Sequence, residues 1–65
     1  MTVTVNGEPR EVPPGTTVAQ VIASLTQQET GIAAAVNGEV VPRGAWSAPL
    51  RDADRIEVVT AVQGG

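Results

Sequence analysis

The sequence predicts an α+β fold, in which a single helix packs across one face of a mixed sheet of four to five strands. The prediction rests on three observations. The pairs Asn6-Gly7 and Asn37-Gly38 each stand between short strand-like runs, and this is the strongest short-range signal for a β-hairpin. One stretch with helical apolar spacing lies between the two hairpins, and an alternating run near the end of the chain supplies a last strand.

The first hairpin is expected from residues 1–5, which alternate apolar and polar side chains, and from a return strand at residues 8–12. Pro9 has no backbone N–H to contribute to a ladder. The return strand is therefore expected at an edge of the sheet or at a bulge.

The second hairpin is expected from residues 32–36 and 39–41, and the last strand from residues 55–62. The alternation in the last strand directs Ile56 and Val58 toward the core. We expect the first and last strands to be able to pair in parallel at the sheet centre, although periodicity does not determine strand order. The opposite face of the last strand is expected to carry Arg55, Glu57 and Val59.

The helix is expected from Val18 to Gln28, with a hydroxyl N-cap at Thr16 or Thr17. Gly31 is a plausible stop signal. Four apolar residues form one stripe at helical spacing, which is interpreted as core and not as a cofactor site. The stripe consists of Val18, Val21, Ile22 and Leu25.

The segment 45–50 is expected to be irregular, with at most one short turn, and it contains the only aromatic residue, Trp46. Trp46 can either cover the edge of the core or contact a partner, and the core is the favoured interpretation. A polar segment follows and is expected to be a solvated turn. It includes Arg51, Asp52, Asp54 and Arg55.

Composition excludes several classes of function. The 65 residues predict one domain, residues 1–65, with no cysteine and no histidine, so a metal site or acid–base catalysis within this chain is not expected. Four arginines against seven acids give a net charge of −3, which argues against a nucleic-acid or anionic membrane surface. Neither a leader segment nor a membrane span is recognised, so a cytoplasmic protein is expected.

The chain ends in Gln63-Gly64-Gly65, and residues 62–65 are expected to form a flexible tail beyond the last strand. Glycine lacks a Cβ atom, so a Gly-Gly tail can pass through a channel that side chains would block. Chance and an expression remnant are the alternative explanations. Val59 and Ala61 are candidate docking residues beside this tail, although single exposed valines are common on protein surfaces.

Several segments together resemble the ThiS family of sulfur carriers, over almost the whole chain. The Asn-Gly-Glu hairpin, the Leu-Arg-Asp-x-Asp-Arg turn and the Gln-Gly-Gly end are rather specific in combination. The segments that carry the resemblance are Val3 to Glu8, Thr17 to Ile22, Ala35 to Arg43, Trp46, Pro49 to Val59 and Thr60 to Gly65.

The resemblance implies a ubiquitin-like β-grasp fold and a sulfur carrier for the thiazole ring of thiamine. It implies that a ThiF-type enzyme, using ATP and Mg²⁺, adenylates Gly65, and that a sulfur-transfer protein then helps to form a thiocarboxylate. The thiazole synthase ThiG would consume that group. Val62, Gln63 and Gly64 would thread the partner's active site. The carrier itself would be a monomer when free, bind no cofactor and not be an enzyme.

Other assignments stay open at this point. The small subunit of molybdopterin synthase is similar in fold and also ends in Gly-Gly, but it is typically longer. A ubiquitin-like modifier would end in an isopeptide bond to a target lysine. Domains of the TGS type share the Pro-x-Gly-x-Thr-Val helix start but lack a free Gly-Gly end, and a plain β-grasp binding module with an idle tail is the last alternative.

Overall fold

The computed structural model describes residues 1–28 and 30–61. The elements agree in order with those expected from the sequence, with one short 3₁₀ helix added. They are β1 (Thr2–Val5), β2 (Glu8–Glu11), α1 (Val18–Leu25), β3 (Ile32–Val36), β4 (Glu39–Val41), η1 (Arg43–Ala45) and β5 (Arg55–Thr60).

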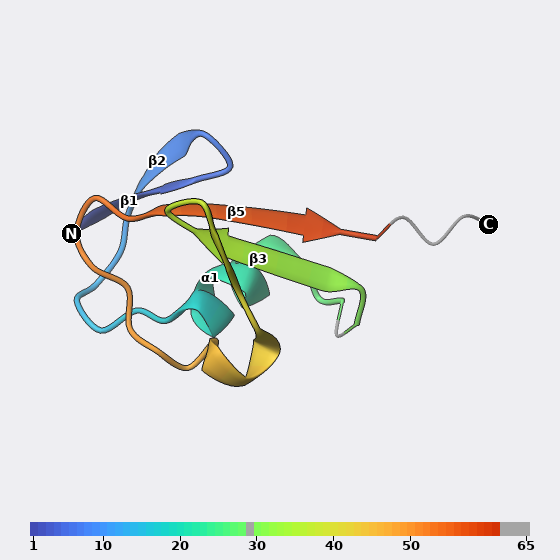
Figure 1. The fold of residues 1–65 in the computed structure, drawn as a ribbon. Coiled ribbons are helices and arrows are strands. Elements are labelled where there is room, and N and C mark those ends of the chain that lie inside the picture. The colour runs from blue at the N-terminus through green and yellow to red at the C-terminus, as the bar shows by residue number, and fades with distance from the viewer. Residues whose placement is uncertain (29, 62–65) are drawn as a thin grey trace.

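The strands form one mixed sheet in the order β2-β1-β5-β3-β4. The last strand, β5, occupies the centre, where it pairs in parallel with β1 and antiparallel with β3. The helix α1 lies across one face of this sheet (Figure 1). The predicted α+β arrangement is confirmed, including the parallel pair of first and last strands.

Both hairpins have the predicted Asn-Gly turns. Asn6 and Gly7 have φ angles of 50° and 84°, and Asn37 and Gly38 have φ angles of 53° and 85°. Positive φ at both central residues is the mark of a type I′ turn, whose twist matches that of the flanking strands. Pro9 lies in β2, opposite Thr4, and β2 is an edge strand as predicted.

The helix begins as predicted and ends earlier. Thr17 is the N-cap: its hydroxyl accepts a hydrogen bond from the Gln20 N–H at 3.2 Å, and the Gln20 side chain accepts one from the Thr17 N–H at 2.9 Å. This reciprocal pair is a capping box. The predicted end at Gln28 is wrong, because α1 stops at Leu25 and Thr26 is extended, with a φ of −154°.

The side chain of Thr26 explains the early end of α1. Its hydroxyl accepts a hydrogen bond from the Gln28 N–H at 3.0 Å. Such local side-chain bonds give the backbone an alternative to the helical ladder. Gly31, with a φ of 71°, therefore belongs to the connection into β3 and does not close the helix.

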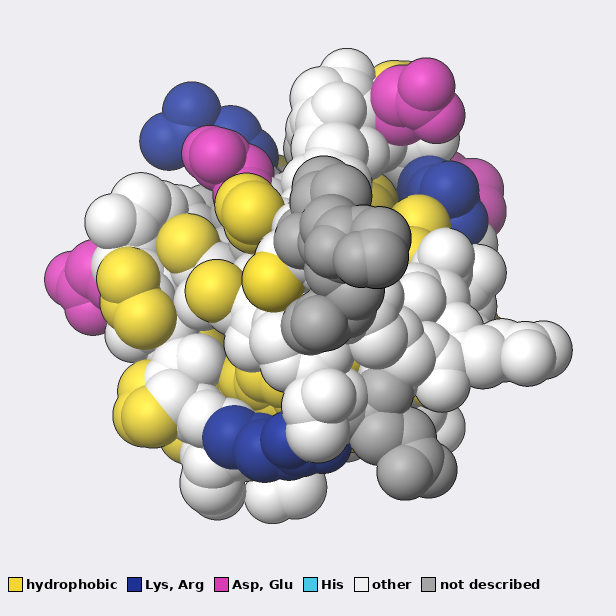
Figure 2. Space-filling model, turned by 90° about the vertical axis from the view of Figure 1, so that its right-hand side faces the viewer, with side chains coloured by type: hydrophobic (Ala, Val, Ile, Leu, Met, Phe, Trp, Pro, Cys, Tyr) yellow, Lys and Arg dark blue, Asp and Glu magenta, His cyan; other side chains and the backbone are white. Residues whose placement is uncertain are grey.

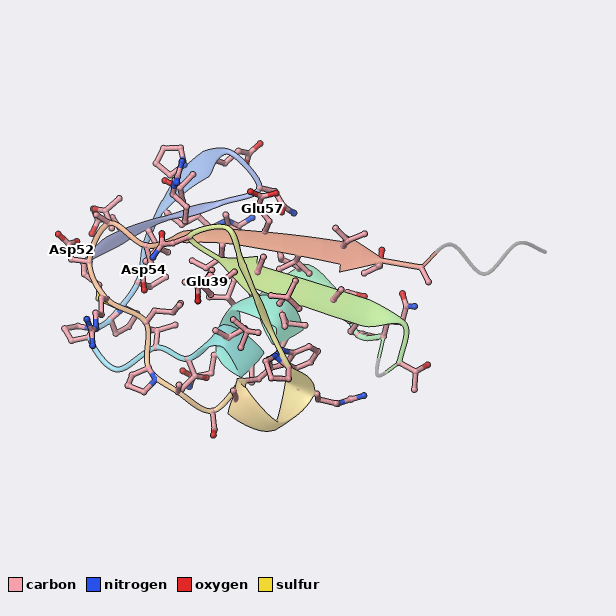
Figure 3. The ribbon with its side chains drawn as sticks, viewed as in Figure 1. Glu39, Asp52, Asp54 and Glu57 are labelled. Carbon is pink, nitrogen blue, oxygen red and sulfur yellow. The ribbon has the colours of Figure 1, made fainter. Side chains whose placement is uncertain are left out.

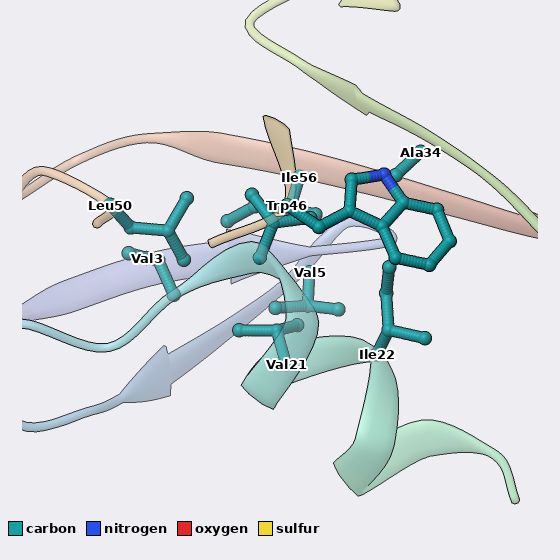
Figure 4. Close-up of a cluster of buried hydrophobic side chains, with 9 residues drawn as sticks. Val3, Val5, Val21, Ile22, Ala34, Trp46, Leu50 and Ile56 are labelled. Carbon is teal, nitrogen blue, oxygen red and sulfur yellow. The ribbon is translucent and has the colours of Figure 1, made fainter. Parts of the chain in front are cut away.

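The core lies between α1 and the sheet, and Figure 4 shows a cluster of its side chains. Trp46 is only 8% exposed, and its indole Nε1–H donates to the Val41 carbonyl at 3.0 Å. The interpretation of Trp46 as a core residue is confirmed. In the described residues the buried core consists of Val3, Val5, Val18, Val21, Ile22, Ala34, Trp46, Leu50 and Ile56.

No helix within residues 1–28 and 30–61 is long and apolar enough to cross a membrane.

Candidate functional site

The central strand carries the chain out of the sheet at its C-terminal end. The last pair in the β3–β5 ladder joins Ile32 to Thr60, and the Ala61 N–H donates to the Gly31 carbonyl at 2.7 Å. The backbone is thus held to the sheet as far as Ala61 (Figure 1). The predicted tail residues lie outside the described part of the chain. They are Val62, Gln63, Gly64 and Gly65.

The two faces of β5 are divided as the alternation predicts. Ile56 is 1% exposed and Val58 is half-buried, on the side of the helix. Glu57 lies on the opposite side of the strand, away from α1 (Figure 3). Val59 lies on that outer face and is 65% exposed, and Ala61 is exposed beside it in sequence. Both candidate docking residues are therefore accessible in the described structure.

Val59 does not stand alone on the outer face of the sheet. It pairs with Ala33 of β3, and on the same face Ala35 pairs with Val40 of β4, which is 78% exposed. Figure 2, viewed from the end where β5 ends, shows hydrophobic side chains gathered on its left-hand side. We call the set of Ala33, Ala35, Val40 and Val59 the outer apolar patch.

Of these four residues, the sequence predicts only Val59 as a docking residue. The other three become neighbours of Val59 only because β3 and β4 follow β5 in the sheet order, and strand order does not follow from periodicity. The sequence does not distinguish Val40 from its apolar neighbour Val41, and only the pairing of Val41 with Ala34 places Val41 on the core side and Val40 on the outer face.

The charged turn that precedes β5 lies far from the outgoing chain. Figure 3 shows Asp52 and Asp54 at the end of the molecule where β5 begins. The Asp54 carboxylate accepts hydrogen bonds from the Arg51 N–H at 2.8 Å and from Asn37 Nδ2 at 2.9 Å, and Asp52 accepts one from the Thr2 N–H at 2.9 Å. The expected solvated turn is largely exposed, but its two aspartates also fix the backbone.

The asparagines of the two hairpin turns both hold β5. Asn37 Oδ1 accepts a hydrogen bond from the Arg55 N–H at 3.0 Å, and Asn6 Oδ1 accepts one from the Val58 N–H at 2.8 Å. The side-chain amides thus contact the strand at its first residue and at its middle. They tie β5 to both hairpin turns.

Comparison with known proteins decides the family. The model of the ThiS family matches residues 3–65. The chain is 30% identical to the Sulfur carrier protein ThiS of Escherichia coli (strain K12) over 66 aligned residues, covering all of both chains. This chain belongs to the ThiS family.

Solved structures of the family share the fold. A crystal structure of a thiamine biosynthesis protein (ThiS) from Geobacter metallireducens superposes with a TM-score of 0.80 at 30% identity, covering all of both chains. A solution NMR structure of a thiamine biosynthesis protein from the same organism gives a TM-score of 0.77 at 29% identity, with all of this chain and 88% of that one covered. The ubiquitin-like β-grasp prediction is confirmed.

Side chains that commonly serve metal binding and acid–base catalysis are few in this chain. The sequence contains neither histidine nor cysteine. Within residues 1–28 and 30–61 no group of three acidic side chains could hold a metal ion. Beyond Glu57, the sequence from Val58 to Gly65 has no charged side chain.

Proposed function

We propose that this chain is a sulfur carrier of thiamine biosynthesis whose C-terminal glycine bears the sulfur. The observation that carries the proposal is the full-length match to the Sulfur carrier protein ThiS of Escherichia coli. The central position of β5, which leads the backbone to Ala61 at one end of the sheet, supports it. The chain would act as a protein cosubstrate and not as an enzyme.

The proposed chemistry takes place at Gly65 in two steps. A carboxylate oxygen attacks the α-phosphorus of ATP and displaces pyrophosphate, which gives an acyl adenylate. A hydrosulfide ion then attacks the acyl carbon, displaces AMP and loses its proton, which leaves a thiocarboxylate. A ThiF-type enzyme would supply ATP, Mg²⁺ and the exclusion of water, a sulfur-transfer protein would supply the sulfur, and ThiG would accept it.

The geometry of the described chain suits this role. From Thr60, the residues Ala61 to Gly65 reach about 17 Å when fully extended, which is enough to enter a covered site. Glycine at the last two positions leaves the acyl carbon unhindered and lets the backbone turn in a narrow channel. Val62 and Gln63 would line the path of entry.

We further propose that the outer apolar patch, together with Ala61, is the surface on which the activating enzyme holds the carrier. Its two valines are the large hydrophobic residues that the described structure leaves most exposed, at 78% for Val40 and 65% for Val59. Exposed apolar patches of this kind mark surfaces that contact other proteins.

Intact mass measurement tests the function. The chain is incubated with ATP, Mg²⁺, a ThiF-type enzyme and a sulfide source, and an enzyme preparation active on its own carrier serves as the positive control. We expect an oxygen-to-sulfur mass gain that fragmentation assigns to Gly65, and transfer of that sulfur to the thiazole synthase reaction. A chain that never gains the mass while the control carrier does would rule the proposal out, and adducts on target lysines would indicate a modifier.

A further inference from the structure

The two edges of the central strand are paired to different extents. On the β3 side the ladder continues to the end of β5, from the pair Val36 and Ile56 to the pair Ile32 and Thr60. On the β1 side the pairing stops where Val5 meets Ile56. Residues 57–60 of β5 therefore extend past the end of β1, and one edge of them has no neighbouring strand.

The backbone groups on this open edge follow from the register. The Arg55 carbonyl and the Ala61 N–H both bond on the β3 side, to Asn37 and Gly31, whereas the Ile56 carbonyl accepts from Asn6 on the β1 side at 2.9 Å. Residues bonded to one neighbour alternate with residues bonded to the other. Val58 and Thr60 therefore direct their N–H and C=O groups toward the open edge.

One of these groups is already satisfied. The Val58 N–H donates to Asn6 Oδ1 at 2.8 Å. The asparagine side chain thus supplies the acceptor that a longer β1 strand would have supplied from its backbone. The Val58 carbonyl and the Thr60 N–H and carbonyl have no hydrogen-bond partner among the residues that the structure describes. A row of unpaired backbone groups on an edge is a template for another strand.

We propose that this open edge, at Val58 and Thr60, binds an extended segment of the adenylating enzyme as an added strand beside β5. The inference rests on the sulfur-carrier function proposed above. Residues 61–65 span at most about 17 Å, so an active site that closes over Gly65 must come within that distance of Thr60. Main-chain bonds to an exposed edge are a recurring way of binding extended segments.

A hollow beside the open edge suits a side chain of such a strand. It lies on the helix side of the sheet, has a volume of about 320 Å³ and is lined by Asn6, Leu25, Thr26, Val58 and Thr60. Successive side chains of a strand point to opposite faces, so every second side chain of an added strand can enter this hollow.

A second copy of this chain is the less suitable occupant. The net charge of −3 makes two copies repel each other. Glu57 lies on the overhanging part of β5, and Glu8 lies directly after the Asn6-Gly7 turn, so an edge-to-edge dimer would bring acidic side chains of both copies together.

Hydrogen exchange at individual backbone amides tests the proposal, with the chain alone and in its complex with a ThiF-type enzyme. We expect the Thr60 amide to exchange rapidly in the free chain and at least about tenfold more slowly in the complex, as for a newly hydrogen-bonded amide. The Ala61 amide, already bonded to Gly31, is the internal control and should be slow in both states. Protection of Thr60 that grows with carrier concentration without enzyme would assign the edge to a second copy and overturn the proposal.

A pair of variants at Thr60 distinguishes the contribution of the backbone N–H to binding from that of the side chain. Thr60→Pro removes the outward N–H, which the fold itself does not use, and Thr60→Ala removes the side chain and keeps the N–H. We expect Thr60→Pro to raise the KM for the carrier about fivefold to tenfold, the value of one hydrogen bond, and Thr60→Ala to have little effect. Melting temperatures identify any loss of folding.

The outcomes also separate this proposal from the proposed function. If the wild-type chain gains the thiocarboxylate while Thr60 stays unprotected in the complex, the edge proposal is wrong and the carrier function stands. If both Thr60 variants raise the KM equally, the side chain and not the edge is responsible, which also overturns the proposal. If no thiocarboxylate forms on this chain while the control carrier gains one, the proposed sulfur-carrier function is itself wrong.

Discussion

Asn37 Nδ2 donates a hydrogen bond to Asp54 Oδ1 at 2.9 Å, across 17 positions of sequence. The Oδ1 atom of the same asparagine accepts from the Arg55 N–H at 3.0 Å, and its backbone N–H donates to the Arg55 carbonyl at 2.8 Å. One turn residue thus joins the β3–β4 hairpin to the start of the central strand. Asn37 must also adopt the left-handed backbone conformation, with a φ of 53°.

Two substitutions at Asn37 separate the side-chain bonds from the backbone requirement. Asn37→Gly keeps the left-handed conformation and loses both side-chain bonds, so we expect a loss of about 1–2 kcal/mol in the free energy of unfolding. Asn37→Ala must also place a Cβ atom at positive φ, and we expect about 1 kcal/mol more. Urea unfolding measures both values. A glycine variant as stable as the wild type would show that the contacts with Asp54 and Arg55 contribute nothing.

Trp46 is expected to contribute to stability and not to partner binding. Trp46→Phe keeps an aromatic ring in the core and removes the Nε1–H that donates to the Val41 carbonyl at 3.0 Å. We expect a destabilisation of about 1–3 kcal/mol, because a carbonyl loses its partner and the site is left underfilled. Thiocarboxylate formation, measured well below the melting temperature, should be unchanged. A slower reaction in a fully folded variant would instead make Trp46 a contact residue.

The elements with strong local signals were predictable from the sequence. The two Asn-Gly turns, a hydroxyl cap at Thr16 or Thr17 and the two faces of β5 all follow from residues close together in the chain. The end of α1 was predicted wrongly, because the Thr26 hydroxyl offers the Gln28 N–H a local bond that competes with further helical turns. A periodic pattern does not report such competition.

Features that depend on strand order were not predictable. The joining of Val40 and Val59 into one patch needs the order β5-β3-β4, and the open edge at Thr60 needs the relative lengths of β1 and β5. The role of Asp54 as an acceptor for Asn37 likewise depends on two turns meeting at one end of the sheet. Each of these features depends on how distant parts of the chain are arranged in the fold, and local propensity does not determine that arrangement.

A charged side chain introduced into the outer apolar patch tests whether this patch binds the activating enzyme. Val59→Arg places a guanidinium at a side chain that is 65% exposed, so the fold should tolerate it, and we expect about a tenfold higher KM for the carrier because a charge must be desolvated at an apolar contact. Ala23→Arg makes the same charge change on the exposed surface of α1, across the molecule. If both variants raise the KM equally, net charge and not the patch controls binding.

Removal of the last two residues tests whether the domain and the reactive end are separate in function. Every buried core residue of the described chain lies between Val3 and Ile56, and the β3–β5 ladder and the bond from Ala61 to Gly31 do not involve Gly64 or Gly65. We therefore expect the variant lacking both glycines to melt within about 2 °C of the wild type, because such a deletion should change the free energy of unfolding by well below 1 kcal/mol in a small domain.

The same variant should gain no sulfur. Its new terminal carboxylate belongs to Gln63, which has a side chain and is two residues short of the position that Gly65 would reach in the partner. Adding Gly-Gly back should restore the reaction, whereas adding Ala-Ala restores the length alone. A marked loss of melting temperature on deletion, or full activity with Ala-Ala, would contradict the view that the glycines serve entry into another protein's active site.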